Sequence, residues 1–360
     1  MTRSYYFGPG PASLPLDVLL EIQSETLNWH KTDLSILEIG HRSSMFQELL
    51  SELSLELRNI LAIPNNYHLI FMGCPTRMHF NLIPMHFIKK EEQAGFWITG
   101  HWSRMAFAEA KNSHQAYKIP LELKNDKWQL KENTAYLYAT INETLEGIRF
   151  DPLAKSSPYP LVADMTSCLT TEPLCVEDYA MLFAGAQKNL GCAGLSLVII
   201  KADFLQNNKV SNLPNYLDYN TYVSTNSLCV TPPTFNCDVM LKVVKWIKAQ
   251  GGVSYLAQEN RKKAQALYAA IDASDFYYNE VPLAARSWVN VTFNLRDKAK
   301  EPDFFAQAKK AGLIGLEGHR VIGGVRASIY NAMPYQGVMH LIDFMMEYEK
   351  NVCKNTSNYY

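Results

Sequence analysis

The 360-residue chain has almost no net charge, because 34 Lys and Arg residues stand against 35 Asp and Glu residues and leave a formal charge of −1. A chain this balanced has no broad electrostatic field for holding nucleic acid or an anionic lipid surface. Any anion must therefore be held by a few placed side chains. Charged residues make up only 19% of the chain and apolar residues 48%, which excludes an intrinsically disordered protein.

Long apolar runs are missing as well. Runs such as Leu195–Ile200 are far shorter than the roughly 20 residues of a membrane-spanning helix. The first fifteen residues lack the apolar stretch of a secretory signal. We therefore expect a cytoplasmic protein without a membrane segment.

Cysteine pairs with the spacing of a metal site are absent. The cysteines are odd in number and form no C-x-x-C motif, at positions 74, 168, 175, 192, 229, 237 and 353. The nine histidines show no paired spacing with them. We expect reduced thiols and no bound metal.

Short apolar runs alternate with amphipathic segments through much of the chain. The runs that predict buried strands are His68–Met72, Gly95–Thr99, Ala135–Ala139, Pro160–Ala163, Ala180–Phe183 and Leu195–Ile200. The segments that predict helices are Pro15–Trp29, Ser43–Ala62, Arg77–Phe87 and Ser103–Asn112. This order favours an α/β fold with a mostly parallel sheet, and function at the loops that follow its strands.

A second region begins near Gly251–Gly252. It reads as a smaller α+β unit, with helices at Val253–Ile271, Pro302–Ala311 and Gln336–Tyr348 and strands at Trp288–Phe293 and Arg326–Tyr330. We predict a large domain over residues 16–252 and a small domain formed by residues 1–15 and 253–360, with the N-terminal arm packed on the small domain or near the active site. The polar tail from Asn351 is expected to fray.

Two polar residues follow predicted buried strands. Lys188 lies in a loop of small residues, Ala184–Gly191, and a partly desolvated lysine there can serve as an amine nucleophile. Asp164 ends the preceding strand. A lysine and a carboxylate of this kind are the pair that pyridoxal 5′-phosphate (PLP) enzymes need. The ordinary alternatives are a solvated lysine and a helix N-cap aspartate.

Other residues could complete such a site. Trp102 follows a predicted strand and could stack on a flat ring, although a core tryptophan is the simpler interpretation. The loop Met72–Arg77 lies between a strand and a helix, where amide donors can hold a phosphate. Positive groups suited to phosphate or carboxylate, or else to ordinary surface ion pairs, are His41, Arg42, His319, Arg320 and Arg326.

Together these segments resemble the phosphoserine aminotransferases, a family of class V, fold-type I PLP enzymes. The resemblance runs from Phe7 to about Tyr348. Its most specific segments are Ala184–Asn189 (AGAQKN), Thr231–Phe235 (TPPTF), Gly318–Gly324 and Arg326–Pro334, with support from Glu38–Arg42 and Trp246–Gly252.

The resemblance implies how PLP would be held. Lys188 would form the Schiff base and then move the proton of the substrate α-carbon, and Asp164 would pair with the pyridinium nitrogen. Trp102 would stack on the ring and Thr144 would bond its hydroxyl. The phosphate would be held by Gln187, by the amides near Thr76 and Arg77, and by Thr231 of the partner subunit. The implied assembly is thus a homodimer with its active sites at the interface.

The resemblance also implies the substrates. Arg42, with Arg320 nearby, would bind the substrate carboxylate, and the phosphate pocket would consist of His41, Arg77, His319 and Arg326. The implied reaction converts 3-phosphohydroxypyruvate and L-glutamate into O-phospho-L-serine and 2-oxoglutarate, a step of serine synthesis. Bacterial members also aminate a longer phosphorylated oxo-acid during pyridoxine synthesis.

Three positions depart from the family pattern. Pro9 stands where a serine is usual, Pro75 removes an amide donor from the phosphate loop, and Val230 replaces an asparagine. These changes keep alternatives open: a class V aminotransferase with another substrate, or a paralogue without catalysis. A cysteine desulfurase is less favoured, because it needs a mobile nucleophilic cysteine and none of the seven lies in an obvious flexible loop. Cys74 and Cys192 are expected to be small buried thiols.

Overall fold

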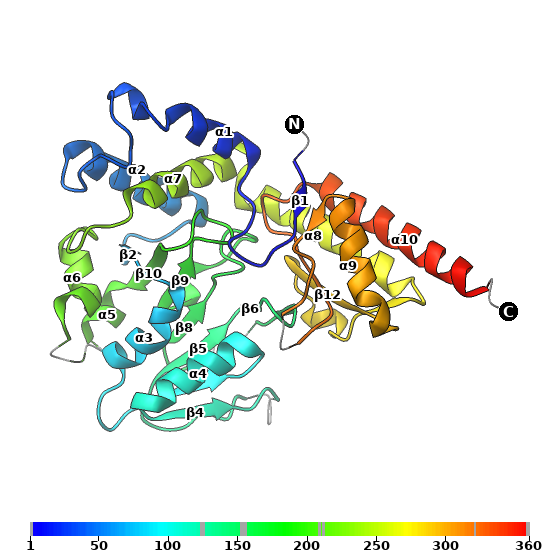
Figure 1. The fold of residues 1–360 in the computed structure, drawn as a ribbon. Coiled ribbons are helices and arrows are strands. Elements are labelled where there is room, and N and C mark those ends of the chain that lie inside the picture. The colour runs from blue at the N-terminus through cyan, green and yellow to red at the C-terminus, as the bar shows by residue number, and fades with distance from the viewer. Residues whose placement is uncertain are drawn as a thin grey trace.

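The computed structural model describes residues 3–122, 127–151, 157–207, 210, 213–319 and 322–357. Its centre is a seven-stranded sheet in the order β2 (Tyr67–Met72), β10 (Ser196–Lys201), β9 (Met181–Gly185), β8 (Leu161–Asp164), β5 (Thr134–Thr140), β3 (Gln93–Trp97) and β4 (Ala116–Ile119) (Figure 1). Strand β10 is antiparallel to β2 and β9, and the remaining pairs are parallel. The predicted mostly parallel α/β sheet is confirmed.

Side-chain alternation along the strands divides the core into two layers. In β5, Leu137 and Ala139 face one core cluster, whereas Tyr136 and Tyr138 face the other. The first face is covered by α2 (Ser44–Leu61), α7 (Thr234–Ala249) and the start of α8 (Gly252–Asp272), and α1 (Leu16–Glu25) packs on α7. The second is covered by α3 (His79–Phe87), α4 (His101–Ser113), α5 (Ala202–Asn207) and α6 (Tyr219–Ser224).

Helix α2 forms where its sequence predicts it. Its apolar side chains recur at helical spacing and are buried, at positions 46, 49, 50, 53, 57 and 61. The Ser43 hydroxyl accepts a hydrogen bond from Phe46 N at 3.3 Å and caps the first turn. The helix ends at Ala62, which takes a left-handed conformation just before Pro64.

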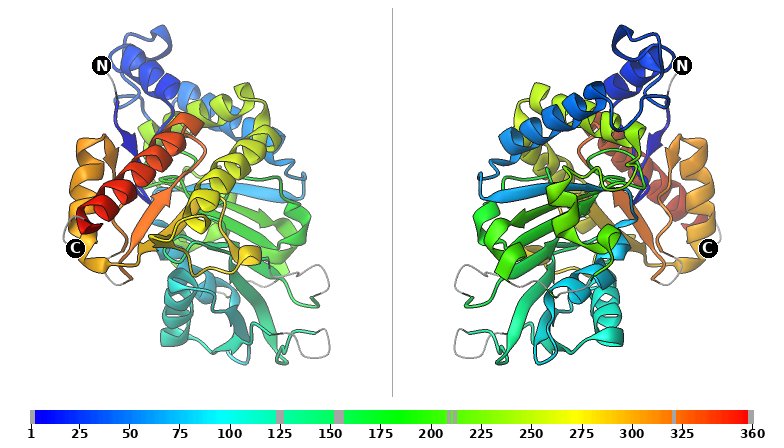
Figure 2. Two further views of the ribbon diagram at one scale, coloured as in Figure 1. Left: turned by 90° about the vertical axis from the view of Figure 1, so that its right-hand side faces the viewer. Right: turned by 90° about the vertical axis from the view of Figure 1, so that its left-hand side faces the viewer.

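A separate core lies in the C-terminal region. It is built from β11 (Tyr277–Tyr278), β12 (Asn290–Leu295), β14 (Val325–Ser328), α9 (Glu301–Lys310), α10 (Tyr335–Ser357) and the pair β1 (Tyr5–Tyr6) and β13 (Leu313–Ile314). Helices α8 and α10 lie side by side (Figure 2). Helix α8 packs Leu256 in the large core and Leu267 in this one. The domain boundary at residue 252 stays a proposal, and the predicted frayed tail is wrong over 351–357 because α10 continues to Ser357.

Within the described residues, no helix combines the length and apolar character that crossing a membrane requires. All seven cysteines are free thiols. Among the same residues, His, Cys, Asp and Glu side chains do not gather in any group of three that could hold a metal ion.

Candidate active site

The site lies where several strands of the large sheet end. Parallel strands β5, β8 and β9 finish at this edge, and antiparallel β10 starts there. A cavity of about 320 Å³ opens at this edge. Seven of the eight residues predicted to hold the cofactor line it: Thr76, Arg77, Trp102, Thr144, Asp164, Gln187 and Lys188.

Lys188 places its amine inside this cavity. Its Nζ donates to Thr144 Oγ1 at 2.5 Å. Burial lowers the pKa of the Lys188 ammonium to about 8, although the carboxylate of Asp164 opposes that shift. The lowered pKa increases the share of this amine that is neutral, which is the form that attacks an aldehyde carbon.

Asp164 is a buried carboxylate at the end of β8. Only 6% of it is exposed, and its Oδ1 accepts a hydrogen bond from Thr166 N at 2.9 Å. Burial raises the pKa of Asp164, whereas the bonds from Thr166 and the charge of Lys188 oppose the shift. A carboxylate this poorly hydrated is stabilised by a cationic ring nitrogen.

Polar atoms without hydrogen-bond partners and the space beside a glycine also fit PLP. Within the described part of the chain, Thr76 Oγ1 and Trp102 Nε1 are buried and have no hydrogen-bond partner. The side-chain oxygens of Thr76 and Gln187 meet in the space beside Gly185, which any Cβ at that position would occupy. The Thr76 hydroxyl and the NH2 group of the Gln187 amide can donate hydrogen bonds to a phosphate, and Trp102 lines the same cavity as Lys188.

The N-terminal arm, which was predicted to pack with the small domain or near the active site, reaches the cavity that holds Lys188. Gly10 and Pro11 line the cavity. Ala12 N donates to Gln187 O at 2.8 Å, and a Cβ on Gly10 would lie 3.4 Å from Lys188 Cγ. Although Pro9 lacks a hydroxyl, its carbonyl accepts a hydrogen bond from Tyr330 Oη at 2.8 Å.

Arg326 on β14 is a buried cation whose charge acts on Lys188. It is 5% exposed, and among the described residues its Nε and Nη1 atoms have no partner. Burial lowers the pKa of the Arg326 guanidinium, and its charge lowers the pKa of Lys188. An unpaired buried guanidinium is stabilised by an anionic ligand.

A second basic cluster gathers at the start of α4. The rings of His101 and His319 lie 5.6 Å apart between centroids. Burial and the nearby His319, Arg104 and Arg77 lower the pKa of His101. The sequence interpretation used only Trp102 from the segment Gly100–Ser103 and missed His101. Arg320 lies outside the described residues.

The remaining predicted residues do not line this cavity. His41 and Arg42 lie in the turn before α2, and Thr231 lies before α7, where Arg42 and Thr231 are exposed. Thr234 Oγ1 donates to Ile36 O at 3.1 Å, which joins the two segments. No side-chain hydrogen bond or ion pair of Arg42 or Thr231 is found among the described residues.

Neither cysteine near the site is activated. Cys74 lies 3.7 Å from Ser196 Oγ and is buried, and burial raises its pKa. Burial also raises the pKa of Cys192. Both side chains are therefore neutral thiols, which argues against a cysteine nucleophile.

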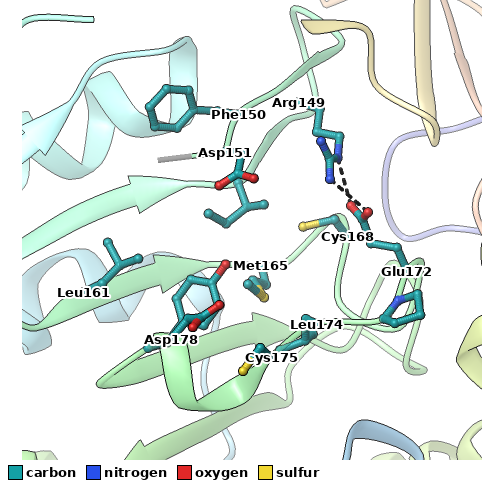
Figure 3. A pocket seen from close by; sticks show the side chains of 13 residues that line it. Arg149, Phe150, Asp151, Leu161, Met165, Cys168, Glu172, Leu174, Cys175 and Asp178 are labelled. Carbon is teal, nitrogen blue, oxygen red and sulfur yellow. Dashed lines mark hydrogen bonds and ion pairs between the residues drawn. The ribbon is translucent and has the colours of Figure 1, made fainter. Parts of the chain in front are cut away.

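A second cavity, of about 280 Å³, opens beside Cys168 and Met165 (Figure 3). Arg149 and Glu172 close one side with a bidentate ion pair, both N–O distances being 2.9 Å. None of the predicted site residues lines this cavity, so we place no function there.

Comparison with known proteins agrees with this geometry. The aminotransferase class V family matches residues 4–341. The phosphoserine aminotransferase of Legionella pneumophila (strain Paris) is 46% identical over 357 residues, which cover 97% of this chain and 99% of the relative.

Solved structures give the same result. The phosphoserine aminotransferase from Bacillus circulans subsp. alkalophilus matches with a TM-score of 0.93 at 37% identity, covering 97% of this chain and 99% of its own. The PLP-bound phosphoserine aminotransferase from Trichomonas vaginalis matches with a TM-score of 0.90 at 33% identity, covering 96% and 100%. The chain described here therefore belongs to the class V aminotransferase family.

Proposed function

We propose that the protein is a PLP-dependent phosphoserine aminotransferase. It reversibly converts 3-phosphohydroxypyruvate and L-glutamate into O-phospho-L-serine and 2-oxoglutarate. The observation that carries this proposal is the enclosed amine of Lys188 in one cavity with the buried carboxylate of Asp164 and with Arg77, while the buried guanidinium of Arg326 acts on the same amine. When bound there, PLP supplies an electron sink for the electrons released at the substrate α-carbon.

The residues of the chain have distinct tasks around that cofactor. Lys188 holds and moves the proton of the α-carbon, and its pKa of about 8 suits both directions of transfer. Thr144 orients the Lys188 amine through the 2.5 Å hydrogen bond. Asp164 keeps a proton on the ring nitrogen, because a buried carboxylate favours a cation beside it.

The two cationic groups suit the two anionic ends of phosphoserine. The α-carboxylate is bonded to the reacting carbon, so its partner must lie close to Lys188. Arg326 is a buried cation whose charge acts on Lys188 and whose Nε and Nη1 atoms have no partner among the described residues, so we assign the carboxylate to Arg326 and not Arg326 to the phosphate pocket that the sequence suggested. Arg77, His101 and His319 then bind the phosphate.

Homodimer formation is part of the proposal. The exposed side chains of Leu27, Leu34 and Leu37 lie in the segment that leads to His41 and Arg42. Solvent-exposed apolar side chains close to a cationic side chain such as Arg42 are typical of a surface covered by another subunit. His41, Arg42 and Thr231 would then complete the partner's active site.

Mixing two inactive variants tests the shared site. Subunits with Lys188→Ala lack the amine, and subunits with Arg42→Ala lack the contribution to their partner. In a mixed dimer one of the two sites has both residues intact, so random mixing should restore about a quarter of wild-type activity. Absence of activity in purified mixed dimers would contradict a shared site.

Substrate choice tests the function itself. A coupled assay should follow 2-oxoglutarate-dependent transamination of phosphoserine and of plain serine. Loss of two charge-assisted contacts to phosphate should lower kcat/KM with serine by about 10²–10⁴-fold. Equal kcat/KM for the two amino acids would favour a class V enzyme with an unphosphorylated substrate.

We further propose a cytoplasmic enzyme of serine synthesis that can also serve pyridoxine synthesis through a longer phosphorylated oxo-acid. Complementation of a serine auxotroph separates this from a paralogue without catalysis, which the exposed Val230 in place of asparagine would favour. Failure of a well-expressed protein would support the paralogue.

A further inference from the structure

We propose that Glu143 is a positioning residue that fixes the Trp102 ring face relative to Thr144 and Lys188. The inference deepens the proposed function, on which it rests. Glu143 belongs to the two-residue strand β6 (Asn142–Glu143), which pairs with β7 (Ile148–Arg149). Glu143 is fully buried and does not line the cavity, so it reaches a bound ligand only through its contacts with other residues and through its charge, which raises the pKa of Lys188.

Alternation along this segment sends successive side chains in opposite directions. Asn142 and Thr144 face the site, since Asn142 Nδ2 donates to Ser167 Oγ at 2.8 Å and Thr144 receives the Lys188 bond. Glu143 faces α4. Its Oε2 accepts from Trp102 N and its Oε1 from Ser103 N, both at 2.8 Å.

The carboxylate thus caps the helix that carries Trp102. Gly100 at the N-cap has no side chain for this task, and two of the first amides of α4 find their acceptor on Glu143 instead. Burial raises the pKa of Glu143 to about 7, whereas the hydrogen bonds from Ser103 and Trp102 oppose that shift because they favour the ionised carboxylate. Because these amides are occupied, they are not free to hold a ligand anion.

Gly100 leaves the room that the carboxylate needs. A Cβ at this position would lie 2.7 Å from both Cγ and Cδ of Glu143 and 2.6 Å from Glu146 Oε2. The backbone of Gly100 is extended, with φ −173°, so close approach and not conformation demands glycine. The residue types at positions 100 and 143 therefore depend on the close contact between Gly100 and the Glu143 side chain.

Glu143 therefore connects Trp102 to Thr144, and through Thr144 to Lys188, over a short path. One peptide bond separates Glu143 from Thr144, which contacts Lys188 Nζ, and one hydrogen bond separates Glu143 from the backbone of Trp102. If the hydrogen bonds from Trp102 N and Ser103 N to Glu143 are lost, the Trp102 ring should shift relative to Lys188. PLP should then bind less tightly and with a less fixed ring.

Two variants disrupt the contact from opposite sides. Glu143→Gln turns one acceptor oxygen into a donor that faces an amide, and Gly100→Ala puts a methyl group where the Glu143 side chain lies. Each should raise the dissociation constant of PLP by about tenfold and lower the visible circular dichroism per bound cofactor. Glu109→Gln, a charge-matched change on the same helix, should match wild type because no hydrogen bond of its side chain is found in the described structure.

The measurements are a PLP titration of the apoprotein, the ratio of visible circular dichroism to absorbance, and the apoprotein Tm. We expect both variants to change the PLP titration and the ratio of visible circular dichroism to absorbance at temperatures where the apoprotein is fully folded. Wild-type values in Glu143→Gln would overturn it, as would losses that vanish when samples are compared at equal folded fraction. Wild-type protein that binds no PLP would instead contradict the proposed function.

Discussion

Replacing Lys188 with alanine should lower kcat by about 10⁴-fold or more and remove the visible absorbance of the PLP-loaded protein. Lys188 is the only lysine among the described residues that line the cavity. Without it, no amine is placed to bond the cofactor aldehyde or to move the α-proton. Both the spectrum and the turnover therefore depend on one nitrogen atom.

The matched control is Lys111→Ala, which removes an exposed lysine of α4 that packs on Phe107, 5.9 Å from its ring centroid. Its spectrum and kcat should equal those of wild type. The measurement is an absorbance scan of each PLP-loaded protein, followed by a phosphoserine assay. A wild-type absorbance band in Lys188→Ala would contradict the assignment.

Arg326→Gln should lower kcat/KM by about 30-fold or more with phosphoserine and with glutamate alike, because it removes one partner of a buried charge pair. Both amino acids carry an α-carboxylate beside the reacting carbon, and Arg326 is the buried cation whose charge acts on Lys188. Arg77→Gln should instead affect phosphoserine more than glutamate, because it weakens the phosphate cluster.

Single-turnover reactions of the loaded enzyme with each amino acid provide the measurement, since they separate the two half-reactions. The decisive quantity is the factor by which each variant lowers the rate with phosphoserine, divided by the factor by which it lowers the rate with glutamate. A loss confined to phosphoserine in Arg326→Gln would return this arginine to the phosphate pocket, where the sequence interpretation placed it.

Regular elements could be predicted because their periodicity is long. Helix α2 carries its apolar stripe for five turns and has a serine cap, and its predicted bounds agree with the structure within one residue. The antiparallel direction of β10 could not be predicted, because a buried apolar strand reads the same in either direction. Strands β6 and β7 have two residues each and are too short for any period.

The central pair of the site could also be predicted, for a physical reason. Lys188 and Asp164 each follow a buried strand, and the ends of parallel strands meet at one edge. The N-terminal arm with Gly10 was expected with the small domain or near the active site, whereas His101 and Glu143 were not predicted. The residues that these two side chains contact lie far away in the chain, and no local sequence pattern indicates those contacts. The predicted roles of His41, Arg42 and Thr231 depend on a second subunit and stay predictions.

The account depends above all on a covalent bond between Lys188 Nζ and the aldehyde carbon of PLP. Borohydride reduction of the loaded protein, followed by peptide mass mapping, fixes and locates that bond. The prediction is a single phosphopyridoxyl group on the peptide that contains Lys188. The strongest competitor is Lys263, whose pKa burial lowers to about 7 but whose amine donates to Tyr330 O at 2.8 Å and Met333 O at 2.9 Å, outside the cavity. Label on Lys263, or no label on any lysine, would contradict the account.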